Sequence, residues 1–284
     1  MGPDSELLAE AVGVCQAVVP VESGGHTRSH AWRVTTAGGA VFVKQAEEAG
    51  SLRMLRREAL VYREVRGPFL PAYVGFADSG ERACLALEFL EDAHWPPPYP
   101  GEVSALFEAL ELVATAEPPL DLPAQKPRWS RWQEIADDPR PFLALRLCSR
   151  AWFEQSLEAL VEAEASADVT GEALVHNDVY SGNVGFTRRG AVLVDWGAAV
   201  RGSAWIDTAF ALLSIRVEGG KPPVLDVPGE PSYAAALAGH LAVEAPAPLP
   251  DWAEPGSTLR EDQAGDLLHA LRWSADLLDL PPLS

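Results

Sequence analysis

The chain has 284 residues, is 48% hydrophobic and carries a formal net charge of -19 at pH 7. This apolar content is enough for a packed core in one large domain or in two lobes. The acidic balance argues against a nucleic-acid partner, because phosphate backbones require basic patches. It suits a cationic ligand, although acidity that only keeps the protein in solution explains it as well.

The cysteines and the apolar runs indicate a compartment. Cys15, Cys84 and Cys148 are odd in number and widely spaced, which is typical of reduced thiols in a cytosolic protein. No apolar run is long enough to span a membrane, and the N-terminus lacks a positively charged leader. We therefore expect a cytoplasmic protein with no membrane partner, as a monomer or a homodimer.

Residues 1–90 show the pattern of a small lobe made of strands with one helix. Short β-branched runs are separated by glycine pairs, and one stretch has helical spacing that ends at Gly67-Pro68. The pattern predicts strands at 18–21, 31–34, 41–43 and 85–90, and a helix at 52–62.

Residues 91–101 carry four prolines and are predicted to be the linker between two lobes. The remaining residues, 102–284, are predicted to form a mainly helical lobe with one short strand. Helical spacing is found at 103–113, 152–161, 232–244 and 259–280, and the apolar strand is at 192–194. The fold class is therefore α+β, with a small antiparallel sheet lobe and a larger helical lobe.

Both asparagines of the chain lie in one short segment, His176-Asn177-Asp178-Val179-Tyr180-Ser181-Gly182-Asn183, and the strand at 192–194 leads into Asp195. Phosphate transfer needs a carboxylate base, and an amide oxygen and a second carboxylate for a metal ion. We predict Asp178 as the catalytic base, and Asn183 and Asp195 as Mg²⁺ ligands. Taken singly, Asp178 also suits a turn and Asp195 a strand end; the combination favours function.

The N-terminal half contains a matching pair of charges. An apolar strand ends in Lys44, one of only three lysines, and Glu58 follows on the next predicted helix. A lysine at this place can reach the phosphates of a nucleotide, and an ion pair with Glu58 would hold it there. The alternative is a surface lysine and a solvated glutamate. The 176–183 segment further along the chain favours the ion pair.

Two further segments are predicted to contact a nucleotide. Ser23, Gly24 and Gly25 lie between two predicted strands and could cover the phosphates, although an ordinary hairpin turn explains them nearly as well. Glu88 and Leu90 precede the linker, where their backbone could hydrogen-bond adenine.

These residues together resemble the aminoglycoside phosphotransferase and choline kinase-like family of small-molecule kinases, which share a two-lobed fold with protein kinases. The resemblance spans roughly residues 20 to 215 and is carried by Lys44, Glu58, the 176–183 segment and Asp195-Trp196-Gly197. It implies ATP and Mg²⁺ as cofactors, a protein kinase-like fold and a small hydroxylated acceptor.

The chain departs from this family at two positions that carry no reacting group. Asn177 replaces the glycine that is common before the loop aspartate, and Gly197 replaces an acidic or polar residue. The resemblance also implies that Asp207 opens a helix behind the loop, either as its N-cap or as a hydrogen-bond partner of the loop.

The acceptor site is predicted less sharply than the nucleotide site. Trp129, Trp132 and Trp205 could present an aromatic wall, and aromatic rings beside carboxylates would suit an amine or a sugar. Simple packing of the helical lobe explains these tryptophans equally well.

We therefore predict an ATP-dependent O-phosphotransferase that moves the γ-phosphate to a hydroxyl of a small molecule by direct in-line transfer. Aminoglycosides, amino sugars and amino alcohols are the acceptor classes considered. A non-catalytic nucleotide-binding regulator is one alternative. A protein kinase is another, but the chain lacks the His-Arg-Asp and Ala-Pro-Glu motifs of those enzymes.

Overall fold

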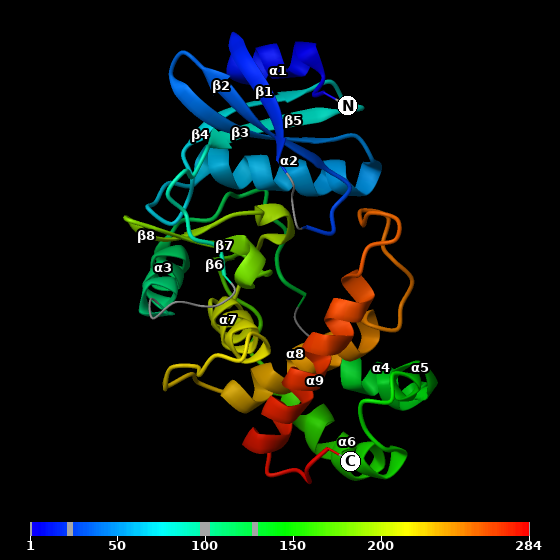
Figure 1. Cartoon of the computed structure of the whole chain (residues 1–284). Helices are drawn as coiled ribbons and strands as arrows, with labels where there is room; N and C mark the ends of the chain where they lie inside the picture. Colours follow the sequence, from blue (N-terminus) through cyan, green and yellow to red (C-terminus); the bar gives the residue numbers. More distant parts are fainter. Residues whose placement is uncertain (1, 22–24, 97–102, 127–129, 284) are drawn as a thin grey trace.

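The computed structural model describes residues 2–21, 25–96, 103–126 and 130–283. In this part of the chain a small lobe, built on an antiparallel sheet, lies above a larger and mainly helical lobe (Figure 1). This arrangement confirms the expected α+β fold with a sheet lobe and a helical lobe. No described helix combines the length and the apolar character that crossing a bilayer requires.

The small lobe contains a five-stranded sheet in the order β1-β2-β3-β5-β4, with every neighbouring pair antiparallel. Its elements are α1 (Ser5–Val12), β1 (Cys15–Val21), β2 (His30–Thr36), β3 (Gly39–Ala46), α2 (Ala49–Glu64), β4 (Tyr73–Asp78) and β5 (Ala83–Glu88). The strands predicted at 18–21, 31–34 and 41–43 and the helix predicted at 52–62 are all present and longer than predicted, whereas the strand predicted at 85–90 lies at Ala83–Glu88 and ends two residues earlier.

Two helices cover this sheet. α1 packs with β4 and β5, and shares a core cluster with Trp32, Val34 and Val43. Its start is capped by Asp4, whose carboxylate accepts hydrogen bonds from the amides of Glu6 and Leu7. α2 lies between the sheet and the large lobe (Figure 1). This position places α2 where a polar side chain can face the junction of the lobes.

Within its described residues, the large lobe contains the six helices α4 to α9 and two small antiparallel ribbons, β6 with β9 and β7 with β8. A further helix, α3, leads into it from the small lobe. The elements are α3 (Val103–Thr115), α4 (Arg131–Asp137), α5 (Arg140–Ala144), α6 (Arg150–Ala165), β6 (Ala173–Val175), β7 (Val184–Thr187), β8 (Gly190–Leu193), β9 (Val200–Gly202), α7 (Trp205–Val217), α8 (Glu230–Glu244) and α9 (Leu259–Leu277).

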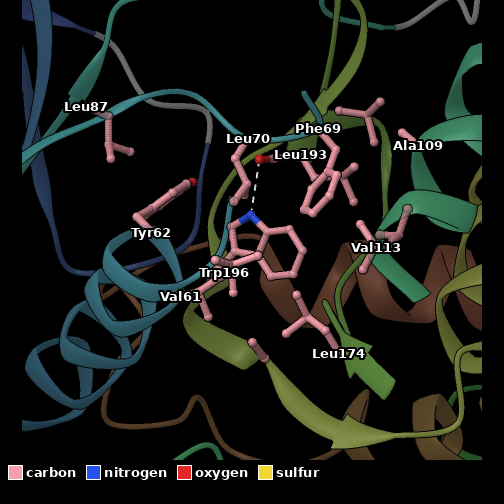
Figure 2. Close-up of a cluster of buried hydrophobic side chains, with 14 of the residues drawn as sticks. Val61, Tyr62, Phe69, Leu70, Leu87, Ala109, Val113, Leu174, Leu193 and Trp196 are labelled. Carbon is pink, nitrogen blue, oxygen red and sulfur yellow. Dashed lines mark hydrogen bonds between the residues drawn. The ribbon is translucent and has the colours of Figure 1, made fainter. Parts of the chain in front are cut away.

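One hydrophobic cluster is shared by the two lobes. Tyr62 of α2, Leu87 of β5, Val113 of α3 and Leu193 of β8 belong to it, and Figure 2 shows the fully buried Trp196 between Tyr62 on one side and Val113 on the other. A second cluster lies entirely within the helical lobe. The predicted boundary at 91–101 falls between β5 and α3, partly outside the described residues, and it stays a prediction.

Hydrogen bonds of the backbone also join the lobes. The Leu193 amide donates to the Phe69 carbonyl at 2.8 Å. His94, beyond the end of β5, exchanges two bonds of 2.8 Å with Phe186 of β7. The chain segment that leaves the sheet is therefore fixed to the β7–β8 ribbon, which comes directly after the predicted catalytic loop.

Candidate active site

The predicted catalytic loop runs from β6 to β7 and ends in a single 3-10 turn, Ser181–Asn183. The amide nitrogen Nδ2 of Asn183 donates to the backbone oxygen of Asp178 at 3.0 Å and to its carboxylate Oδ2 at 3.1 Å. These two bonds close the loop on itself. They use only the nitrogen of the amide group, so the Asn183 side-chain oxygen keeps its lone pairs for another ligand.

Asp207 fixes the start of the loop from behind. Its carboxylate accepts hydrogen bonds from the backbone amides of His176 at 2.7 Å and Asn177 at 2.8 Å. Asn177 has φ of 64°, a left-handed conformation that asparagine tolerates better than most residues. Asp207 lies in the first turn of α7 after the N-cap position, which is Ala204. Asp207 is therefore a hydrogen-bond partner of the catalytic loop and not the N-cap of α7.

His176 is the first residue of the loop after β6 and is fully buried. Its Nε2 is 2.9 Å from the carbonyl oxygen of Val194, so Nε2 carries the proton, because a carbonyl only accepts. Burial lowers the pKa of His176 to about 4, which keeps the ring neutral. The ring also lies against Trp196, with 4.5 Å between the ring centroids. His176 therefore orders the loop.

Lys44 joins the small lobe to the second acidic motif. Its Nζ is 2.9 Å from Oε2 of Glu58 on α2 and 3.0 Å from Oδ1 of Asp195. Burial by itself lowers the pKa of Lys44, but the charges of Asp195 and Glu58 outweigh it and raise the pKa overall. The structure therefore brings together three of the predicted site residues and keeps the lysine charged.

Asp195 is aimed by the strand before it and by the turn after it. β8 ends at Leu193, and Asp195 has φ of 62° before the short turn Trp196–Ala198. A positive φ at a residue other than glycine carries strain and is concentrated at functional sites. The indole nitrogen of the buried Trp196 donates to the Leu193 carbonyl at 3.1 Å, which anchors the turn (Figure 2).

Asp178 is partly exposed, so its carboxyl group can meet a ligand. The surrounding protein nevertheless raises its pKa to about 7, mainly through burial and next through the negative charge of Asp195. The negative charges of Asp207 on α7 and Asp266 on α9 add to this effect. A carboxyl group with this pKa can change its protonation state near neutral pH, as a general base must.

The other residues predicted to contact a nucleotide lie before β2 and at the end of β5. Gly25 is exposed, with no atom within 4 Å of the place where a Cβ would lie. Ser23 and Gly24 fall outside the described residues. The Glu88 carboxylate is bound by Arg189 at 2.8 and 3.1 Å and by the Ala72 amide at 3.0 Å. The Glu88 amide donates to the Ala72 carbonyl at 2.8 Å, so its carboxylate and its amide both already have partners within the protein. Leu90 follows the end of β5 and is half-buried.

The predicted aromatic wall is wrong at Trp132. This side chain is fully buried in the core of the helical lobe, and its indole nitrogen donates to the Ala235 carbonyl at 2.8 Å. It is therefore a packing residue. Trp129 lies outside the described residues. Trp205 is 39% exposed at the start of α7, so it remains available to a ligand.

Two aromatic residues that the sequence analysis did not single out lie at the site. Tyr180 belongs to the catalytic loop, is 37% exposed and lies over Gly182, where a Cβ would be only 2.6 Å from the ring. Phe42 precedes Lys44 by two residues on β3, so both side chains leave the same face of the sheet. The two-residue spacing of strands and the position of Tyr180 between Asp178 and Asn183 were the available signals.

Comparisons with solved structures agree on the fold. A variant of aminoglycoside phosphotransferase APH(4)-Ia, solved with ADP and hygromycin B, matches with a TM-score of 0.59 and 14% identity, over 98% of this chain and 99% of that one. Spectinomycin phosphotransferase APH(9)-Ia, solved with ADP and spectinomycin, gives 0.57 and 14%, over 94% and 96%. A protein assigned as a fructosamine-3-kinase from Haemophilus somnus 129PT gives 0.51 and 15%, over 93% and 96%.

These identities are too low to carry more than the fold, which is the expected kinase-like one. A comparison with curated proteins finds no match. The sequence itself is more decisive, because a family model described as the phosphotransferase enzyme family matches residues 18–243, and this range includes Lys44, Asp178 and Asp195. The chain therefore belongs to the phosphotransferase enzyme family and is a small-molecule kinase.

Proposed function

We propose that the protein transfers the γ-phosphate of ATP directly to a hydroxyl group of a small, positively charged molecule. The observation that carries the proposal is the convergence of Lys44, Glu58, Asp178, Asn183 and Asp195 from both lobes. Phosphate transfer needs mainly positioning and charge stabilisation, which these residue types supply. The ADP and AMP-PNP complexes of proteins with this fold support a nucleotide ligand.

Each residue has a role that follows from its position. Lys44 would neutralise phosphate oxygens, and Glu58 holds its ammonium group in place at 2.9 Å. Phe42 shares the face of β3 with Lys44 and offers its ring to the base of the nucleotide. Asp178 would accept the proton of the acceptor hydroxyl as that oxygen attacks. Direct transfer follows because this set contains no serine or cysteine nucleophile.

The donor set at the loop fits a magnesium ion. The Asn183 amide oxygen is left unused by the two bonds that its nitrogen makes, and Asp195 is bound to Lys44 through Oδ1. Oxygen ligands of this kind suit Mg²⁺, which is commonly held by few protein groups together with substrate phosphates. When bound, such an ion would neutralise charge on the phosphates.

The acceptor class follows from the charge around Asp178. Burial and the negative charges of Asp262 and Glu218 raise the pKa of Asp266 on α9 to about 6, and the charge of Asp266 in turn raises the pKa of Asp178. Tyr180 and Trp205 add partly exposed aromatic rings. Carboxylates beside aromatic rings bind amines well. We therefore favour an aminoglycoside, an amino sugar or an amino alcohol over a neutral sugar.

The test is ADP release with Mg-ATP across hygromycin B, spectinomycin, glucosamine, choline and glucose, with Asp178→Ala as the matched variant. We expect an amine-bearing acceptor to stimulate ADP release. Asp178→Ala should lower that rate by at least about 100-fold, the usual contribution of a positioned base. Its affinity for Mg-ADP should persist, because Asp178 does not hold the nucleotide.

Full activity of Asp178→Ala would disprove the assignment of the base. Tight binding of Mg-ATP without ADP release for any acceptor would favour a nucleotide-binding regulator. Transfer of radiolabelled phosphate to protein substrates would indicate a protein kinase instead.

A further inference from the structure

A second connection between the lobes lies away from the backbone bonds at β7. Residues 26–28, which lie just before β2, contact residues 252–257, which precede α9. We call these two segments the clasp. Figure 1 shows the chain before α9 rising toward the small lobe. The clasp therefore joins the segment next to the predicted phosphate loop to the helix whose Asp266 acts on Asp178.

Backbone hydrogen bonds form the centre of the clasp. The Arg28 amide donates to the Trp252 carbonyl at 2.8 Å, and the Glu254 amide donates to the His26 carbonyl at 2.7 Å. Thr27 and Ala253 are thus opposite each other as a non-hydrogen-bonded antiparallel pair. The arrangement is one rung of a sheet between segments more than 200 residues apart.

Side chains strengthen this rung. The Arg28 Nε donates to the Ala253 carbonyl at 2.7 Å. His26 shares a hydrogen bond of 2.7 Å between its Nδ1 and the Ser257 hydroxyl, and its Nε2 is 3.4 Å from Oδ2 of Asp262. Asp262 belongs to the first turn of α9, so His26 contacts the helix itself. These side chains are partly shielded, with His26 25% and Arg28 32% exposed.

α9 packs against α7, and Asp207 of α7 holds the start of the catalytic loop through two hydrogen bonds. The charge of Asp262 acts on Tyr180, and the charge of Asp266, one turn further along α9, acts on Asp178. One side of the first turns of α9 is therefore held by the small lobe, while the carboxylates of these turns lie near the place where an acceptor must bind. A shift of the residues next to the phosphate loop would move these carboxylates with it.

We propose that His26 and Arg28 are positioning residues for the acceptor. Through the clasp they hold the acidic start of α9 beside Asp178, and they transmit the position of the nucleotide side of the cleft to the acceptor side. This inference rests on the proposed phosphotransfer function. It adds a role for residues that touch neither the reacting atoms nor a predicted metal ligand in the described structure.

The first experiment compares the steady-state kinetics of the wild type, His26→Ala/Arg28→Ala and Arg82→Ala with the most active acceptor of the panel. Arg82 is the matched control, because it pairs with Asp4 and Glu47 on the small lobe. The clasp variant should raise the KM for the acceptor by about tenfold, the effect of one or two lost hydrogen bonds. Its kcat should stay within about twofold, and Arg82→Ala should match the wild type.

A covalent rescue separates positioning from a general loss of structure. A non-hydrogen-bonded pair has its Cα atoms about 4.5 Å apart, which a disulfide can span. Thr27→Cys and Ala253→Cys are added to His26→Ala/Arg28→Ala, with the single Thr27→Cys addition as the control for oxidation of native thiols. Oxidation should restore the KM for the acceptor, and reduction should raise it again. An unchanged KM in the clasp variant, or no rescue on oxidation, would overturn the proposal.

A second measurement needs no acceptor. Mg-AMP-PNP should slow amide hydrogen exchange at residues 259–266 in the wild type and have no effect there in the clasp variant. An equal effect in both proteins would contradict the clasp as the connection. No binding of Mg-AMP-PNP to the wild type would instead be a failure of the proposed function, so the two failures are told apart.

Discussion

At the scale of single residues, the loop depends on a histidine that must stay neutral. His176 has no exposed surface, and its Nδ1 has no hydrogen-bond donor among the described residues. Protonation would therefore place an unpaired N–H and a positive charge in the interior, which is costly. This explains why a histidine is used as a structural group, bonded to Val194 and packed on Trp196.

This burial predicts a pH dependence of stability. The pKa of His176 is about 4 in the folded chain against an ordinary value of 6.5. The contribution of the neutral His176 ring to the free energy of unfolding is complete above pH 6.5 and is lost as the pH falls toward 4. Urea unfolding at pH 7.5 and pH 4.5 should show that the wild type loses roughly 2 to 3 kcal/mol more than His176→Gln. Equal losses in the two proteins would show that His176 does not titrate in this way.

At the scale of elements, α2 is placed by the turn that follows Asp195. Gly197 has so little space that a Cβ there would be 3.0 Å from Cβ and 3.2 Å from Cε of Met54 on α2. The absence of a side chain lets the helix approach closely, and this approach brings Glu58 to Lys44. The departure from the family pattern at Gly197 therefore has a packing function.

We predict that Gly197→Val lowers kcat by at least about tenfold, because the added side chain would push Met54, and α2 with it, away from the turn. The displaced α2 would lengthen the contact of Glu58 with Lys44. A second change, Met54→Ala, should restore part of the rate by making room for the new side chain. Phosphotransfer by the single and double variants checks this, with thermal unfolding to confirm that each is folded. An unaffected rate in Gly197→Val would refute the packing role.

The elements that could be predicted are those whose signal repeats locally in the sequence. The long periodic helices, such as α6 and α9, were predicted because their apolar faces repeat over several turns. α1 and α5, with 8 and 5 residues, are too short for such a repeat. β4 was missed because it is short, contains Gly75 and has a register shift there.

The site divides in the same way. Lys44 and Glu58 are only fourteen residues apart, and strand and helix periods suffice to bring them together. The burial of Trp132 depends on the Ala235 carbonyl, 103 residues away, and no local pattern contains that contact. Indole rings suit both a core and a binding site, so their location needed the structure.

At the scale of the whole molecule, Arg189 in the turn between β7 and β8 connects the large lobe to the end of β5 in the small lobe. It binds the Glu88 carboxylate twice and also donates to the Leu70 carbonyl at 3.4 Å. Because the carboxylate is turned to this arginine and to the Ala72 amide, the side chain of Glu88 has no part left for a nucleotide.

Glu88→Ala should therefore leave the Kd for Mg-ADP within about twofold of the wild-type value, since partly exposed ion pairs contribute roughly 0 to 1 kcal/mol. Lys44→Ala is the contrasting variant, and its affinity should fall because it removes a phosphate contact. Calorimetric titration measures both. A loss of about tenfold or more in Glu88→Ala would mean that the carboxylate does take part in nucleotide binding.

The hydrophobic cluster around Trp196 has a consequence for recombination between relatives. Leu87 and Tyr62 of the small lobe belong to the same buried cluster as Val113 and Leu193 of the large one (Figure 2). A chimera that takes its first 90 residues from one kinase of this fold and the rest from another would inherit two half-cores with different shapes. Such exchanges would need matched substitutions on both sides, so we expect the two halves of this interior to diverge together.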